Sequence, residues 1–379
     1  MKRMMGWALA LFLLLGNVAA LATTANAVAG KNFDAFEMHC AGKTKDGLLL
    51  FGGSYLEQGK WMPTIMGVNT KGTVQWTFQQ ESLLDKSYYR DVKQMEDGSL
   101  IALRSNDNSG KAWLIEHIVD RQVIQAVEVL DDVWGAYPMA EGFLVSSKKD
   151  AETATIRRMD FSGQEIWKKN FDKYTMIYGI ISSDNMHVAM GSRMQENETY
   201  GDRGTGIVFA FDDAGEILWG HVTGQPDSFL PGVWAEAGSV VLVGNTSPNE
   251  PDEDIAPGFI CKYNKDGLVW RKDYNRVFPA GGMVNMIAVA DGYMVVSAAH
   301  ETYTNATFSH FDMEGNLKSE MARDLPSMYV RGLFCLEAIG NKIFFVASGK
   351  GHSGTNKVEN QNDLPNVAMI QEIRILQAG

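Results

Sequence analysis

Short apolar segments recur along the chain at a regular spacing. Most of the segments follow a turn signal such as Asp97-Gly98 or Asp291-Gly292, and each segment is followed by small or polar residues. The seven segments are Leu48–Gly52, Leu100–Leu103, Phe143–Ser146, His187–Met190, Val240–Val243, Tyr293–Val296 and Ile343–Val346. They begin roughly 43 to 53 residues apart, a period typical of repeated small sheets. An apolar run of this length between turn signals predicts a buried β-strand.

A second motif follows most of these segments and consists of Asn or Asp, two residues, Gly and then Trp. It occurs at Asn69–Trp76, Asp160–Trp167, Asp212–Trp219 and Asn264–Trp270, while Asp312 and Gly315 repeat it without the Trp. The Asn or Asp side chain caps a tight turn, and Gly supplies the positive φ that the turn needs. We expect the Trp that follows to pack between neighbouring sheets, where its large surface is best buried.

Each unit therefore predicts four antiparallel strands: an inner strand, the apolar strand, the strand before the Gly turn and the strand after it. Such a sheet cannot bury both faces by itself, but a closed ring of similar sheets can. We predict an all-β fold, a seven-bladed β-propeller of four-stranded antiparallel blades, forming one domain over residues 28–379. The last unit ends at Ile373–Leu376 without a fourth strand. Residues 28–33 could supply it, so that N- and C-terminal strands close the ring.

Residues 1–27 have the features of a secretory signal peptide. Lys2 and Arg3 precede the apolar run Trp7–Leu15, and Ala25-Asn26-Ala27 provides a cleavage site. The apolar run is too short to span a bilayer. We therefore predict export, to the periplasm or to the cell surface or beyond.

Charge narrows the classes of partner. Removal of the two basic residues of the signal peptide changes the formal net charge from −12 to −14, that is, −12 minus 2. Such a surface repels phosphates and anionic lipid, so we predict no nucleic-acid partner and no membrane insertion of the mature chain.

The three cysteines are too few for a disulfide scaffold and match no metal-binding spacing. Cys40 and Cys335 fall at similar places on the inner strands of the first and last units, which a closed ring makes neighbours. We predict a disulfide between them, the alternative being two buried free thiols. Cys261 is expected to be a small apolar filler.

The run Phe259–Trp270, followed by Asp291–Val296, resembles the "KLDxxGxxxW … DGGYxxxG" repeats of secreted bacterial and archaeal β-propeller proteins. These repeats are related in fold to the quinoprotein-like propellers, and the resemblance covers nearly the whole mature chain. It implies the fold but says little about function. Residues that match the calcium and quinone ligands of quinoprotein dehydrogenases are not found here. The propeller lipoprotein of outer-membrane protein assembly is closer in size and is a scaffold, but this chain lacks a lipid-attachment cysteine.

The two faces of the predicted ring differ in the length of their connections. Short turns lie on one face, and long connections such as Arg193–Gly206, Asn245–Gly258 and Gly349–Pro365 lie on the other, which makes it the predicted binding face. Five side chains align near the mouth of the central channel on this face, and they are Arg90, Trp134, Tyr178, Asn285 and Arg331. Aromatic and guanidinium groups around an opening suit a carboxylate, a sugar or a peptide segment. The alternative is that they only fill the channel.

No catalytic, phosphate-binding or dinucleotide-binding signature occurs in the sequence, and we predict no cofactor and no metal. The acidic run around Asp252 lacks the spacing of a calcium loop. The leading hypothesis is an exported, non-enzymatic scaffold that presents its long-loop face to a protein or glycan partner. The alternatives are a lyase or hydrolase acting on an extracellular polymer at the channel mouth, and a cell-surface or filament-associated structural subunit.

Overall fold

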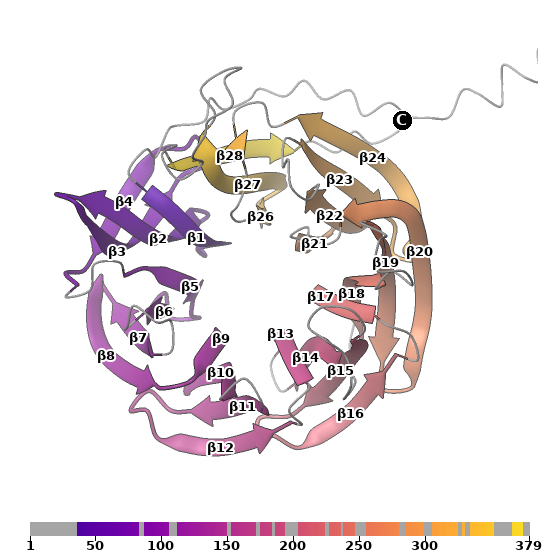
Figure 1. Cartoon of the computed structure of the whole chain (residues 1–379), viewed down its shortest axis with the longest axis horizontal. Coiled ribbons are helices and arrows are strands. Elements are labelled where there is room, and N and C mark those ends of the chain that lie inside the picture. Colours follow the sequence, from indigo (N-terminus) through magenta and orange to yellow (C-terminus); the bar gives the residue numbers. More distant parts are fainter. Residues whose placement is uncertain are drawn as a thin grey trace, which may run out of the picture.

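The computed structural model of the chain describes fifteen stretches, all of them in or next to β-strands. These are residues 36–82, 87–105, 112–149, 153–171, 175–183, 186–193, 204–223, 227–235, 238–246, 255–279, 285–298, 305–324, 328–329, 334–351 and 366–373. The strands form seven antiparallel sheets arranged in a ring around a central opening (Figure 1). The predicted seven-bladed β-propeller is confirmed.

The innermost strands line the opening (Figure 1). They are β1 (Phe36–Lys43), β5 (Tyr89–Gln94), β9 (Asp132–Met139), β13 (Thr175–Ser183), β17 (Asp227–Trp234), β21 (Asn285–Val289) and, in the last blade, β25 (Met328–Tyr329) with β26 (Phe334–Ile339). The second strands are β2 (Leu49–Glu57), β6 (Leu100–Ser105), β10 (Gly142–Lys149), β14 (Met186–Arg193), β18 (Val240–Thr246), β22 (Gly292–Ala298) and β27 (Lys342–Gly351). The apolar segments of the sequence thus form the second strands, as predicted.

The third and fourth strands complete the blades toward the outside. The third strands are β3 (Lys60–Val68), β7 (Trp113–Val119), β11 (Thr153–Met159), β15 (Thr205–Phe211), β19 (Ile255–Asn264), β23 (Asn305–Phe311) and β28 (Asn366–Ile373). The fourth strands are β4 (Val74–Gln79), β8 (Gln122–Val129), β12 (Glu165–Asn170), β16 (Ile217–Val222), β20 (Gly267–Pro279) and β24 (Leu317–Asp324). In the last blade, β28 pairs along one edge of β27. The short strands β25 and β26 both pair with β27 along its other edge. Residues 28–33, predicted to pair next to β28, lie outside the described residues.

Each second strand contains an apolar run because both of its faces are buried there. Leu49 and Phe51 pack against the last blade, whereas Leu50, between them, packs against the second blade. The same alternation at the other strands gives seven hydrophobic clusters, one at each interface between neighbouring blades. One cluster joins the last blade to the first, and Lys43 Nζ donates a 3.0 Å hydrogen bond to the Ala338 carbonyl across the same seam. Side-chain packing between β1 and the last blade therefore closes the ring.

The tryptophans of the turn motif pack between blades, as predicted. The Trp167 indole lies against Gly215 in the turn of the next blade and donates to the Asp213 carbonyl at 2.8 Å. Trp270 lies against Gly315 of its next blade in the same way. A Cβ atom on Gly315 would come within 2.5 Å of the Trp270 ring. The Gly and the Trp of the motif thus meet across each of these two interfaces.

Cys40 is a free, buried thiol. It belongs to the cluster between the first and second blades, so it faces away from the last blade, where Cys335 lies. The predicted disulfide between Cys40 and Cys335 stays a prediction. The side chain of Cys335 lies outside the described residues. Cys261 is buried between the fourth and fifth blades, in agreement with its prediction as a filler.

Cys40 should therefore react as a free thiol once the chain is unfolded. Burial and the nearby Asp91 carboxylate raise the pKa of the thiol far above its usual value, so the native protein should react slowly with iodoacetamide. Without reductant, mass spectrometry should find Cys40 alkylated after denaturation but largely unmodified before it. Recovery of a peptide in which Cys40 is bonded to Cys335 would contradict this expectation.

Candidate binding face at the channel mouth

The strand bounds confirm that the two ends of the ring carry connections of different length. Tight turns such as Asn69–Thr73 and Asp212–Glu216 join third to fourth strands at one end. At the other end, second and third strands are joined across Arg193 to Thr205, Thr246 to Ile255 and Gly351 to Asn366. The inner strands begin at this second end. The residues inside the three long connections, including the acidic run around Asp252, lie outside the described residues.

Several inner strands carry a β-bulge near this end. The pairing with the second strand skips one residue in each of the first four blades, and the skipped residues are His39, Arg90, Trp134 and Tyr178. β17 shows a similar irregularity between Phe229 and Gly232. A bulge bends a strand and redirects the side chain of the extra residue. Three of the five residues predicted at the channel mouth, Arg90, Trp134 and Tyr178, are therefore the extra residues of bulges near the long-connection end of their inner strands.

Glycine on the second strand makes room for two of these bulges. A Cβ atom on Gly53 would come within 2.0 Å of the Glu37 carbonyl oxygen. On Gly191 it would come within 1.8 Å of the Met176 carbonyl oxygen. The inner strand approaches its neighbour so closely there that only a residue without a side chain fits.

Trp134 and Tyr178 form a stacked pair that joins the third and fourth blades. Their ring centroids are 6.0 Å apart and the rings are within 9° of parallel. Hydrogen bonds fix both ends of the pair, since Trp134 Nε1 donates to Asp132 at 3.2 Å and the Tyr178 hydroxyl lies 3.1 Å from the Ser192 hydroxyl. Tyr178 remains 39% exposed. The pair is thus a rigid aromatic surface that stays accessible to a ligand.

Arg90 lies beside this pair and joins the second blade to the third. Its guanidinium donates to the Val133 carbonyl at 3.0 Å, lies 3.7 Å from the Asp132 carboxylate and is 5.2 Å from the centre of the Trp113 ring. The side chain is still 39% exposed. Leu130, on the connection just before β9, is 73% exposed. Leu130, Arg90, Trp134 and Tyr178 are called the mouth surface below.

The other two predicted residues differ from these three. Asn285 begins β21, and its side-chain oxygen accepts a 2.9 Å hydrogen bond from the Leu336 backbone amide of the next blade, which gives it a structural role. Arg331 lies outside the described residues. The sequence prediction missed His39, whose ring stacks on Tyr88 at 4.2 Å. His39 is the bulge residue of the first blade, as Arg90, Trp134 and Tyr178 are in the next three blades.

The charged groups near the mouth surface form ion pairs and hydrogen bonds with neighbouring side chains. Lys93 forms an ion pair with Asp91 and lies 4.4 Å from the centre of the Tyr137 ring. Burial lowers the pKa of Lys93, but Asp91 and Tyr137 outweigh it, so this pKa stands above its ordinary value. Glu116 accepts hydrogen bonds of 2.7 Å from both Tyr89 and Arg104. Each of these charged groups therefore has a charged or hydrogen-bonding partner within its own blade or the next one.

The best-connected histidines lie at the opposite, short-turn end. His187 Nδ1 is 2.9 Å from the Ser182 hydroxyl and its Nε2 is 2.8 Å from Asp213, so it ties together two turns of one blade. His310 lies 3.2 Å from Asp291 in a similar place. Burial lowers the pKa of His310, so the neutral ring is favoured.

Within the described stretches, no group of three or more His, Cys, Asp or Glu side chains is arranged to hold a metal ion. A search of the same residues finds no helix that is long and apolar enough to cross a membrane.

Comparison with known proteins identifies the fold only. No family model and no curated protein matches the sequence. Among solved structures, the chain is similar to Sqt1 of Saccharomyces cerevisiae, with a TM-score of 0.54 and 8% identity over 93% of this chain and 100% of that one. It is similar to a chain of the mitotic checkpoint complex, with a TM-score of 0.53 and 11% identity over 92% and 90%. The β-propeller domain of the trilobed protease of Pyrococcus furiosus gives 0.50 and 12% over 85% and 97%.

Proposed function

We propose that this chain is an exported, non-enzymatic binding scaffold that holds a protein partner on the mouth surface. The observation that carries the proposal is the exposed, hydrogen-bonded Trp134–Tyr178 stack, which shares Asp132 with Arg90 and follows the exposed Leu130 in the chain. Aromatic and arginine side chains held rigid lose little entropy on binding and dominate the energetics of protein interfaces. That a chain of similar fold belongs to the mitotic checkpoint complex supports a role in protein assembly.

Export rests on the sequence of residues 1–27, where Lys2 and Arg3 precede an apolar run and an Ala25-Asn26-Ala27 cleavage site. These residues lie outside the described part of the chain. N-terminal sequencing of the protein recovered from the periplasm or culture medium tests this part of the proposal. A mature N-terminus near Val28 supports it, and an intact Met1 in the cytoplasm contradicts it.

Truncation of the aromatic pair should weaken binding of the partner. We expect Trp134→Ala and Tyr178→Ala each to reduce retention of the partner at least about tenfold, since aromatic anchors at interface centres contribute about 2 kcal/mol or more. The measurement is quantitative capture from a native envelope extract on the immobilised full chain, followed by titration of the retained protein. Ile166→Ala is the matched control, because Ile166 is 50% exposed on β12 at the outside of the ring.

The same variants separate the alternatives. The fourth strands expose further apolar side chains, among them Ile124 at 56% and Val222 at 61%, and this favours a structural subunit with contacts along the outer edge as the second candidate. In that case Ile166→Ala, and not Trp134→Ala, weakens binding. Retention of a polysaccharide that is cleaved during the assay would indicate the enzyme instead, and unchanged binding by both aromatic variants would exclude the mouth surface.

A further inference from the structure

The first blade carries an arm that is formed by its second and third strands. β2 and β3 are nine residues each, and they are joined by the tight turn Gln58-Gly59. Both turn residues have positive φ, 51° and 81°, as a two-residue hairpin requires. The ladder between the two strands runs without interruption to Glu57 opposite Lys60. The arm is therefore a continuous hairpin that extends past the end of β4, on the long-loop side of the ring.

A proline explains why β4 does not follow the arm to its tip. The pairing of β3 with β4 ends at Thr64 opposite Gln79. Gln80 still donates a 3.1 Å hydrogen bond to the Pro63 carbonyl, but proline has no N–H to return. Beyond this residue the chain diverges from β3 and leaves an open groove of about 710 Å³.

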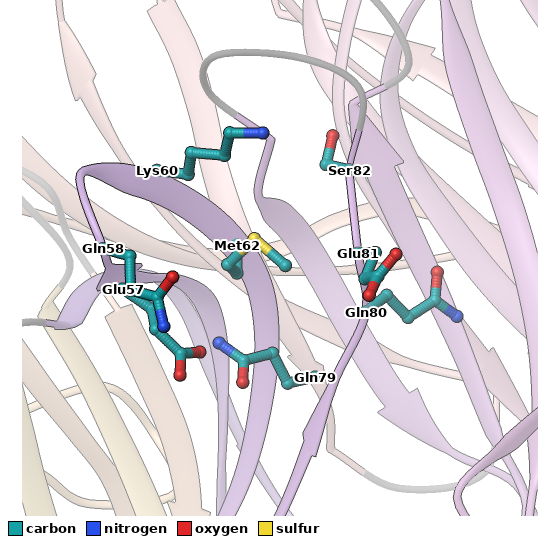
Figure 2. A pocket seen from close by; sticks show the side chains of 8 residues that line it. All are labelled: Glu57, Gln58, Lys60, Met62, Gln79, Gln80, Glu81 and Ser82. Atoms are coloured by element: carbon teal, nitrogen blue, oxygen red, sulfur yellow. The ribbon is translucent and has the colours of Figure 1, made fainter.

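The groove is lined by polar side chains around one apolar side chain, that of Met62 (Figure 2). Its lining residues are Glu57, Gln58, Lys60, Met62, Gln79, Gln80, Glu81 and Ser82. Met62, on β3, lies at the centre of the view, between Glu57 and Gln58 on one side and the Gln79–Ser82 segment on the other (Figure 2). Tyr55 is the cross-strand partner of Met62, so it lies on the same face of the arm, and it is 40% exposed.

These groups match the chemistry of a neutral sugar. The side-chain amides both donate and accept hydrogen bonds, while carboxylates accept from hydroxyl groups and an ammonium donates to them. A thioether and an aromatic ring provide the apolar surface on which the C–H face of a pyranose can rest. The two carboxylates outnumber the single ammonium, which disfavours an anionic polymer.

The backbone of the arm is less suited to an extended peptide. A peptide that adds as a strand depends on free main-chain donors and acceptors along an edge. On this edge the Trp61 carbonyl already accepts from Ser87, the Pro63 carbonyl accepts from Gln80, and Pro63 has no donor. Recognition in the groove must therefore come from side chains.

We propose that the groove on the first blade binds a neutral oligosaccharide, with Tyr55 and Met62 as the platform and Gln58, Gln79 and Gln80 as hydrogen-bonding groups. This site is separate from the mouth surface and independent of the proposed protein partner.

Isothermal titration calorimetry of the full chain tests the proposal with three neutral hexasaccharides, cellohexaose, maltohexaose and chitohexaose. At least one should bind with a dissociation constant below 10 mM as an order-of-magnitude expectation. Gln79→Ala and Tyr55→Ala should each weaken that binding about tenfold or more. Gln125→Ala on β8 is the matched control, since it removes an exposed glutamine outside the groove, and Trp134→Ala should also leave the affinity unchanged.

Three results would overturn the assignment: no binding of any of the sugars, binding that Gln79→Ala leaves intact, or competition by an extended peptide such as (Thr-Val)₃ that depends on Gln79. Unfolding midpoints of the variants show whether each one is folded. Because Gln79 is exposed at the end of an outer strand, its variant keeps the test valid even if Tyr55→Ala destabilises the arm.

Discussion

Gly191→Ala should lower the free energy of unfolding by about 3 kcal/mol or more, the upper range for an overpacked site. Its new Cβ atom would lie 1.8 Å from the Met176 carbonyl oxygen, on the inner strand just before the bulge at Tyr178. Relief of this contact requires the two strands to separate, which breaks backbone hydrogen bonds within the buried part of the blade. Urea unfolding followed by fluorescence measures the loss.

A neighbouring glycine provides the control. Gly179 follows Tyr178 on the same inner strand, and a Cβ atom there would meet nothing closer than Met190 at 3.9 Å. We expect Gly179→Ala to change stability by less than about 1 kcal/mol, as surface substitutions usually do. Equal losses for the two variants would show that close strand approach at Gly191 does not support the bulge.

Gly315→Ala should destabilise the protein by about 3 kcal/mol, because a left-handed backbone costs about 1–2 kcal/mol for a residue with a side chain and overpacking adds a similar amount. Gly315 has a φ of 78°, and a Cβ atom would come within 2.5 Å of the Trp270 ring. Gly59→Ala isolates the backbone contribution, since Gly59 has a φ of 81° and nothing within 4 Å of its Cβ position. Gly59→Ala should lower the free energy of unfolding by about 1 kcal/mol.

A double-mutant cycle then measures the contact itself. Trp270→Ala alone should destabilise the interface between the fifth and sixth blades, because it removes a ring that packs against the hydrophobic cluster of this interface. In the Trp270→Ala background, Gly315→Ala should cost no more than Gly59→Ala does. Additive losses would mean that the ring and the turn glycine are not coupled.

Much of the fold follows from local patterns in the sequence. The run Val240–Val243 is apolar at every position because both faces of a second strand contact another blade, and this can be recognised without coordinates. The turn glycines are recognisable because positive φ is a local requirement. The place of Trp167 and Trp270 between blades follows from one repeated motif, and seven repeats predict seven blades.

The candidate sites depend on the register between strands, which the sequence encodes only weakly. Alignment predicted Arg90, Trp134 and Tyr178 at the mouth and left out His39, but it could not show that all four are bulge residues, because a single extra residue in a bulge is not visible in an apolar–polar pattern. The groove on the first blade forms where Pro63 ends a ladder, and its effect depends on which strand lies next to it.

The orientation of Cys40 shows the limit most directly. The repeats alone indicate that Cys40 and Cys335 occupy equivalent positions on their inner strands, and the pairings of Cys40 with Gly52 and of Cys335 with Val346 agree with this. The tertiary structure shows that the Cys40 thiol faces the second blade: Met38, two residues earlier, faces the last blade, and the bulge at His39 between them shifts the alternation of side chains by one residue. Equivalent positions in two adjacent repeats predict that two residues lie on neighbouring inner strands. Contact between their side chains also requires that each side chain faces the other strand.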